Sequence, residues 1–283
     1  MIAQPKFQWG ISTLGCHELD LAQICRLANQ HHIHAIEIRS LADRLDLPQY
    51  LDETYKDANE IQAVLDTYRQ SIIALNSGFS LIDAQEADRA DMLGFARWAE
   101  ALGIPYIRAF GGGDMANPLT EQGMDNAVAN LEWWHQIRKT KGWQTKLALE
   151  IHGGFSSAKR CLRLQEHAGI PLDIIWDTHH SWKMGNETPQ ETWDQIAPLV
   201  RHVHIKDSIS VPSARYPYSY VLPGTGEFPA DDVLDLLASN DYKGVVSLEW
   251  ERKWHPYLPP LDQALDALVA NGWKQDSHPL TAP

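Results

Sequence analysis

Cysteine is scarce in this sequence of 283 residues, which contains only Cys16, Cys25 and Cys161. The first two lie nine positions apart, and no pair forms a CxxC arrangement. This pattern matches neither a disulfide framework nor a structural zinc site. Such sparse cysteine is typical of proteins in a reducing compartment, and we expect a cytoplasmic protein.

The sequence also lacks long apolar runs and an excess of basic residues. No stretch of about 18 uninterrupted apolar residues occurs, and the start, MIAQPKFQWG, has no basic segment followed by an apolar one. We therefore expect neither export nor a membrane partner. Lysine and arginine total 24 against 37 acidic residues, a net charge of −13. Because an acidic surface repels phosphate backbones, we do not expect nucleic acid as a partner.

Eight short apolar runs rich in β-forming residues alternate with longer amphipathic stretches along the chain. This alternation is typical of repeated βα units with a parallel sheet, and eight such units close a barrel of roughly 250 residues. We expect the α/β class and a single (β/α)8 TIM barrel domain over residues 1–283. The expected strands are residues 7–13, 35–41, 71–77, 106–112, 146–152, 173–179, 200–206 and 244–250.

The longest irregular stretch, residues 207–228, follows the seventh expected strand. A loop of this length in a compact fold is more often functional than idle. It carries Arg215, Tyr216, Tyr218 and Tyr220. We interpret these side chains either as a cover for a substrate or as rings that rest on the barrel surface.

Each of the last four expected strands ends with a side chain that can bind a metal ion: Glu150, Asp177, His204 and Glu249. In a TIM barrel the C-terminal strand ends face a common basin. Burying three carboxylates there is costly unless a cation compensates them, so we expect a divalent metal. Oxygen-rich ligation with one imidazole suits Mn²⁺, Mg²⁺ or Co²⁺, and Zn²⁺ accepts the same donors.

Histidines and a lysine lie beside these strand ends. His152 and Lys206 each follow one of the four residues by two positions and so share its face of an extended strand. We interpret them as substrate contacts, or else His152 as a solvated loop histidine and Lys206 as the ion-pair partner of Asp207. His180, on the turn after the sixth strand, either contacts substrate or is a rim residue without function. We expect His202 to face the helices.

The first half of the chain offers further polar strand ends. Glu37 and Arg39 end the second expected strand, Asn76 the third and Arg108 the fourth. The guanidinium of Arg108 can hold a carboxylate or phosphate of a substrate through two hydrogen bonds. The alternative for Arg108 is an internal ion pair with Glu37.

The segments LEIH, DTHH, HVHIKD and VSLEWE, within residues 146–251, together resemble strand ends of the xylose isomerase-like barrel superfamily. This superfamily includes sugar isomerases, ketose 3-epimerases, hydroxypyruvate isomerase, inosose and 3-dehydroshikimate dehydratases, and endonuclease IV. The first half of the chain resembles the superfamily only in the alternation of strand-like and helix-like stretches. The resemblance implies that the metal ligands are Glu150, Asp177, His204 and Glu249, and that the substrate is faced by His152, His180 and Lys206.

A metal flanked by two carboxylates can bind the adjacent oxygens of a hydroxy-ketone or hydroxy-aldehyde and stabilise the enediolate formed on proton removal. In isomerase and epimerase members of the superfamily, one glutamate removes the proton and the opposite one returns it. We therefore expect a metal-dependent isomerase or epimerase of a small polyhydroxy carbonyl compound. Glu150 and Glu249 are its expected catalytic residues. A homo-oligomer is compatible with this interpretation.

Two departures from the ketose 3-epimerase pattern argue against a free-ketose 3-epimerase. Those enzymes have a glutamate six positions after the first metal glutamate and an arginine six after the metal histidine, where this chain has Ser156 and Ser210. The second hypothesis is a dehydratase of the 3-dehydroshikimate or inosose type, in which an enolate loses water. Four residues are at least as compatible with it: Arg108, His152, His180 and Lys206.

Two further alternatives carry less support. An endonuclease IV-like DNA repair enzyme would need histidines on the third and fourth strands, and ALNSGF and IRAFGG supply none. The net negative charge also argues against it. A non-catalytic barrel that has retained the site is the last alternative, and the intact set of four metal-competent residues argues against it.

Overall fold

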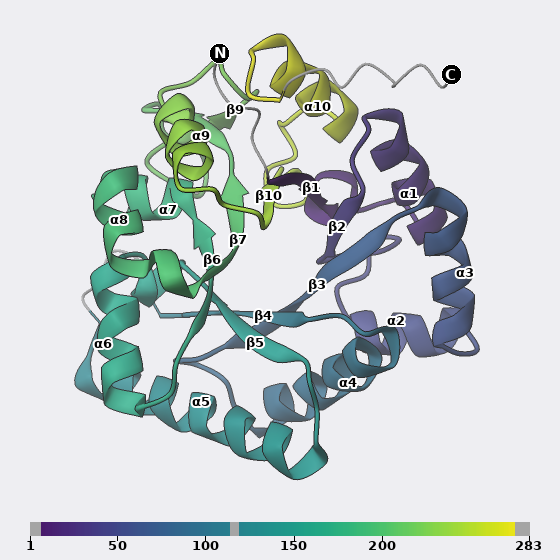
Figure 1. Ribbon diagram of the computed structural model, residues 1–283, viewed down its shortest axis with the longest axis vertical. Coiled ribbons are helices and arrows are strands. Elements are labelled where there is room, and N and C mark those ends of the chain that lie inside the picture. The colour runs from purple at the N-terminus through teal and green to yellow at the C-terminus, as the bar shows by residue number, and fades with distance from the viewer. Residues whose placement is uncertain (1–6, 114–118, 275–283) are drawn as a thin grey trace.

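A closed barrel of eight parallel strands forms the centre of the computed structural model, which describes residues 7–113 and 119–274. Neighbouring strands pair in the order β1-β10-β7-β6-β5-β4-β3-β2, and helices surround them (Figure 1). The prediction of a (β/α)8 TIM barrel is confirmed. The barrel strands are β1 (Gln8–Ser12), β2 (Ala35–Ile38), β3 (Ser71–Ser80), β4 (Tyr106–Phe110), β5 (Lys146–Glu150), β6 (Asp173–Asp177), β7 (Val200–Ile205) and β10 (Val245–Leu248).

All eight expected strands are present, and most end earlier than the apolar runs suggested. The runs included the first residues of the βα loops, where the backbone has already turned away from the sheet. β3 is the exception and extends to Ser80. The final residues of several runs therefore lie in the loops at the rim of the barrel, and one of them, His152, lines a cavity.

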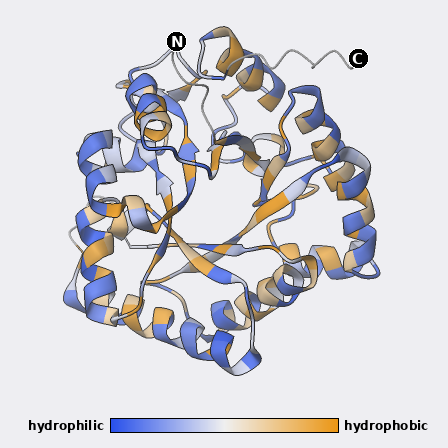
Figure 2. Ribbon diagram, in the orientation of Figure 1, coloured by the Kyte–Doolittle hydropathy of each residue, from blue (hydrophilic) through white to orange (hydrophobic). Residues whose placement is uncertain are grey.

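Helices cover the outside of the barrel and present their polar faces outward (Figure 2). Among the helices of residues 7–113 and 119–274, none is both long and apolar enough to cross a membrane. The α-helices are α1 (Leu21–Gln30), α2 (Leu47–Thr54), α3 (Ala58–Tyr68), α4 (Glu86–Leu102), α5 (Glu121–Lys141), α6 (Ala158–Ala168), α7 (Thr178–Lys183), α8 (Pro189–Ile196), α9 (Ala230–Ser239) and α10 (Leu261–Ala270). Short 3-10 helices are η1 (Thr13–Cys16), η2 (Gly153–Phe155) and η3 (Ala197–Leu199).

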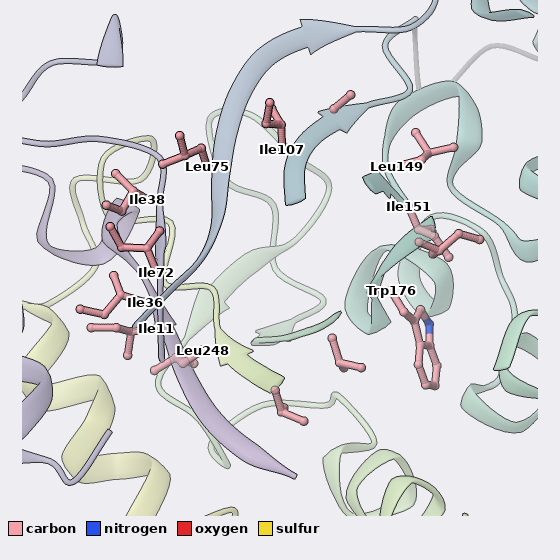
Figure 3. Close-up of a cluster of buried hydrophobic side chains, with 14 of the residues drawn as sticks. Ile11, Ile36, Ile38, Ile72, Leu75, Ile107, Leu149, Ile151, Trp176 and Leu248 are labelled. Atoms are coloured by element: carbon pink, nitrogen blue, oxygen red, sulfur yellow. The ribbon is translucent and has the colours of Figure 1, made fainter. Parts of the chain in front are cut away.

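The apolar core positions the polar strand ends. Leu149 and Trp176 are fully buried members of the hydrophobic cluster, part of which is drawn in Figure 3. Successive side chains of a strand point to opposite faces. The residues that follow them, Glu150 and Asp177, therefore point to the other face of the sheet, into the barrel.

Two glycines bring the loops after β4 and β5 together beside the barrel mouth. Gly112 and Gly153 have φ angles of +77° and +59°, which L side chains rarely adopt. A Cβ atom on Gly153 would lie 2.5 Å from the carbonyl oxygen of Gly112. The N–H of Gly154 donates to that same oxygen at 2.6 Å. This close approach fixes the path of the chain immediately after the strand ends.

Candidate functional site

Four side chains from neighbouring strands meet at the C-terminal end of the barrel. Glu150 ends β5, Asp177 ends β6, His204 lies in β7 and Glu249 directly follows β10. All four are buried, and their potential ligand atoms lie within 4.8 Å of one another. Three carboxylates and one imidazole at this separation form a donor set that suits a divalent cation. The structure thus brings together the residues that the sequence predicted to converge.

His204 connects this cluster to a carboxylate on the opposite side of the barrel. Its Nδ1 atom lies 3.0 Å from Oε1 of Glu150 and 3.4 Å from Oε2 of Glu249. Its Nε2 atom lies 2.9 Å from Oε2 of Glu37, which also accepts a hydrogen bond from Asn76 Nδ2 at 2.9 Å. Burial alone would lower the pKa of His204, but Glu37 and Glu249 raise it well above its usual value.

Lys206 lies between three carboxylates and is 1% exposed. Its Nζ atom is 2.7 Å from Oδ2 of Asp177 and 2.7 Å from Oε1 of Glu251, and it also contacts Glu249. The alternative pairing with Asp207 is wrong. The carboxylate of Asp207 instead accepts hydrogen bonds from the backbone N–H groups of Ser208, Gly224, Gly226 and Phe228.

Glu251 is a site residue that the sequence reasoning missed. It is 8% exposed, contacts Lys206 and lines the same cavity as Glu249. The signal was present in the string VSLEWE, because a residue two positions after Glu249 shares its face in an extended chain.

His152 and His180 pack against each other beside the cluster, with ring centroids 4.7 Å apart. His180 is 2% exposed, and its Nδ1 atom lies 3.0 Å from Oδ2 of Asp177. Among the described residues, Nε2 of His180 and Nδ1 of His152 have no hydrogen-bond partner. Burial, followed by the nearby His180, lowers the pKa of His152 to about 4. His152 is therefore a neutral imidazole at neutral pH, able to accept or donate one hydrogen bond to a ligand.

A cavity of about 230 Å³ opens above these side chains. Five of the predicted site residues line it: Arg108, Glu150, His152, His180 and Glu249. Asp177, His204 and Lys206 contact the lining residues but are themselves fully buried. The two glutamates predicted to exchange a proton therefore share one small cavity with both predicted substrate histidines.

The stretch over residues 207–228 contains a hairpin of β8 (Asp207–Ile209) and β9 (Ser219–Val221). Tyr218 and Tyr220 are buried, and both rings pack against His179. Tyr216 stacks on Tyr218, with centroids 5.0 Å apart, and lines the cavity together with Arg215. Tyr218 and Tyr220 therefore rest on the barrel, whereas a role of Arg215 and Tyr216 in covering a substrate stays a prediction.

The expectation that His202 faces the helices is wrong. His202 lies two residues before His204 and therefore shares its face of β7. It is 3% exposed, its ring centroid lies 5.0 Å from that of His204, and its Nε2 atom lies 2.8 Å from Oγ of Ser247. Glu37, His202 and His204 form a second group whose potential ligand atoms lie within 4.8 Å of one another.

The alternative pairing of Arg108 with Glu37 is also wrong. The nearest carboxylate oxygen to Arg108 Nε is Oε2 of Glu150, at 3.4 Å. Glu37 instead contacts His204 and Asn76, as described above. Sequence reasoning therefore missed Glu37 as a neighbour of the four-residue cluster.

The family model of the xylose isomerase-like TIM barrel matches residues 25–270. The chain belongs to this family. The match covers the second half of the chain, which carries the four-residue cluster. It also covers most of the first half, whose resemblance to the superfamily lay only in the alternation of strands and helices. No curated protein matches the sequence significantly.

Solved structures of low sequence identity share the fold. The probable 3-DHS dehydratase AsbF, involved in petrobactin synthesis in Bacillus anthracis, is 18% identical with a TM-score of 0.73, over 93% of this chain and 99% of its own. The IOLI protein with a bound zinc atom is also 18% identical with a TM-score of 0.73, over 94% and 96%. A xylose isomerase domain containing protein from Salmonella typhimurium LT2 is 14% identical with a TM-score of 0.70, over 94% and 96%.

Proposed function

We propose that this protein is a divalent-metal-dependent isomerase or epimerase of a small sugar or related polyhydroxy carbonyl compound. The observation that carries the proposal is the placement of Glu150 and Glu249. Both belong to one cluster of metal-competent residues, and both line one cavity of about 230 Å³. A cavity of this size suits a small molecule rather than a polymer.

The described residues fit a divalent cation. The potential ligand atoms of Glu150, Asp177, His204 and Glu249 lie within 4.8 Å of one another. Oδ2 of Asp177 is buried and lies 2.7 Å from Lys206 Nζ and 3.0 Å from His180 Nδ1. In our proposal Glu150, Asp177, His204 and Glu249 hold the ion. When bound, the metal polarises adjacent oxygens of a hydroxy-carbonyl compound and acidifies the C–H bond between them. Mn²⁺, Mg²⁺ and Co²⁺ suit the donor set, and Zn²⁺, which the IOLI structure contains, accepts it too.

In this mechanism the chain's own residues move the proton. One of Glu150 and Glu249 removes a proton from the substrate carbon, and the other returns a proton to the same or the adjacent carbon. His152 and His180 hold substrate hydroxyl groups through their unpartnered ring nitrogens.

A dehydratase is the second candidate function. His180 lines the same cavity as the glutamates, and a histidine in that position can protonate a leaving hydroxyl group. The likeness to the dehydratase AsbF concerns the fold, and it adds this reaction class to those worth assaying.

Proton transfer to carbon can be tested directly in D₂O. The Mn²⁺-loaded protein is incubated with hexoses, pentoses, inososes or 3-dehydroshikimate, and the products are followed by NMR. Deuterium incorporation with carbonyl migration or stereochemical inversion supports the isomerase or epimerase. Loss of water supports the dehydratase, and absence of both deuterium incorporation and turnover with metal bound contradicts both functions.

Removal of the metal is expected to lower thermal stability. A ligand that binds only the folded state stabilises it by about 2.7 kcal/mol at one hundred times its Kd. We therefore expect Tm to fall on dialysis against EDTA and to recover on addition of Mn²⁺, as measured by calorimetry. If Tm changes neither on dialysis against EDTA nor on addition of Mn²⁺, the result would contradict metal binding to the folded protein.

Glu37 is expected to hold His204 in the orientation that a metal requires. A carboxylate can only accept, so the hydrogen bond between them is donated by Nε2–H, which leaves Nδ1 facing Glu150 and Glu249. Such partners of metal-binding histidines typically change metal affinity by about 10–100-fold. Glu37→Gln should weaken Mn²⁺ binding at least about tenfold in titration calorimetry.

The matched control for Glu37→Gln is the same substitution at Glu166, an exposed residue of α6. Glu166→Gln should leave the Mn²⁺ affinity unchanged. If Glu37→Gln lowers Tm but binds Mn²⁺ as tightly as the unmodified protein, the role of Glu37 is structural and the prediction is wrong.

A further inference from the structure

Three guanidinium groups from distant parts of the chain meet around the cavity. Arg39 directly follows β2, Arg108 lies in β4, and Arg215 belongs to the connection between β8 and β9. All three line the cavity that contains Glu150 and Glu249. The side chain of Arg108 is 7% exposed, Arg39 is partly buried and Arg215 is exposed.

Among the described residues, one of these arginines has a carboxylate partner: Nε of Arg108 lies 3.4 Å from Oε2 of Glu150. Among residues 7–113 and 119–274, neither Arg39 nor Arg215 has an ion-pair partner or a hydrogen-bond partner for its side chain, and Nε of Arg108 has no hydrogen-bond partner. A buried charged group without a partner is costly, so arginines inside proteins are normally paired. Five arginines away from the cavity pair with carboxylates: Arg44, Arg97, Arg163, Arg201 and Arg252.

Aromatic rings hold the three groups while leaving their N–H donors free. The guanidinium carbons of Arg39 and Arg215 lie 6.0 and 5.6 Å from the ring centroid of Trp254. That of Arg108 lies 5.4 Å from the ring of Phe110. Cation–π contacts of this kind orient a guanidinium without using its hydrogen bonds. The donors therefore remain available to a ligand in the cavity.

Arg39 and Arg108 also repel each other. Burial, followed by the charge of Arg108, lowers the pKa of Arg39 to about 10. An anion bound between two guanidinium groups relieves this repulsion and can accept paired hydrogen bonds from each. Lys206 does not compete for such an anion, because its ammonium group already contacts Asp177, Glu249 and Glu251.

We propose that the substrate of this site carries an anionic group, a carboxylate or a phosphate, that is bound by Arg39, Arg108 and Arg215. The inference rests on the proposed function and specifies its substrate class. The carbonyl end of the substrate lies against Glu150 and Glu249, and the anionic end lies against the arginines. A cavity of about 230 Å³ limits the whole molecule to the size of a monosaccharide derivative.

Three sugars that differ only at C6 test the inference: D-glucose, D-glucuronate and D-glucose 6-phosphate. Their Kd values are measured by titration calorimetry on the Mn²⁺-loaded protein. At least one anion should bind about tenfold or more tightly than D-glucose, as expected for charge-assisted hydrogen bonds. The carboxylate and phosphate probes distinguish the two sources of charge.

Variants assign the preference to the arginines. Arg39→Gln and Arg108→Gln should each reduce the ratio of the two affinities, anion to D-glucose, by about tenfold, with less change in the binding of D-glucose itself. Arg163→Gln, on α6, removes one positive charge away from the cavity and should preserve the ratio. If Arg108→Gln does not fold, Arg39→Gln alone carries the test, because Arg39 is less buried.

Equal affinity for the three sugars, absence of binding by both anions, or an anion preference that survives in the arginine variants would each overturn the inference. A separate Mn²⁺ titration shows which proposal has failed. If the unmodified protein binds no Mn²⁺, the proposed function falls. If it binds Mn²⁺ and interconverts sugars but binds the three sugars with equal affinity, only the inference of an anionic substrate is wrong.

Discussion

Glu150→Gln and Glu249→Gln are each expected to lower kcat/KM by about a thousandfold for the substrate identified by the D₂O assay. Glutamine keeps the size of glutamate but cannot take up a proton. Both residues line the cavity and contact His204 through a carboxylate oxygen. The measurement is kcat/KM at saturating Mn²⁺, so that weaker metal binding does not account for the loss.

Deuterium exchange separates the roles of the two glutamates. The variant that lacks the residue removing the proton should show no exchange at the substrate carbon. The variant that lacks the returning residue should still allow exchange while its product forms slowly. Glu166→Gln is the matched control and should retain full activity. If either active-site variant loses less than about tenfold, its glutamate is not a proton-transfer residue.

Lys206→Met is expected to destabilise the metal-free protein by about 3–5 kcal/mol. Lys206 is 1% exposed, and its ammonium group contacts Asp177, Glu249 and Glu251. Burial alone would raise the pKa of Asp177 and Glu249, but neighbouring cations, Lys206 among them, hold both pKa values well below the usual range. Methionine fills a similar volume but leaves the three carboxylates without this cation. The free energy of unfolding in urea, after dialysis against EDTA, measures the effect.

Added Mn²⁺ should restore more stability to Lys206→Met than to the unmodified protein, because the ion replaces the missing positive charge. The matched control is Lys243→Met. Lys243 is exposed and pairs with Asp241, so its replacement should change stability by no more than about 0.5 kcal/mol. A metal-free Lys206→Met variant as stable as this control would contradict the account of the buried charges.

The barrel could be predicted from the sequence because its signals are local. Each buried strand, such as residues 146–150 or 173–177, is a short apolar run, and a helical stretch separates it from the next. The meeting of strand ends follows from the topology of a parallel barrel and not from details of side-chain packing. This explains why Glu150, Asp177 and His204 could be placed together, although their role as metal ligands stays a prediction.

Contacts across the barrel could not be predicted in the same way. Glu37 and His204 are separated by 167 positions and meet only when the barrel closes. Lys206 has carboxylates on both sides, and its choice of partner depends on side-chain rotamers. The arginines around the cavity likewise come from elements with no shared local pattern. The error at His202 had a different cause, because the period of a strand alone places it on the face of His204.

We propose above that one divalent cation is held by Glu150, Asp177, His204 and Glu249. A crystal structure of the protein with Mn²⁺, examined by anomalous diffraction, tests it most directly. We expect one strong peak within about 2–2.5 Å of a donor atom from each of the four side chains. A peak elsewhere, or none at a Mn²⁺ concentration that saturates binding in solution, would contradict it.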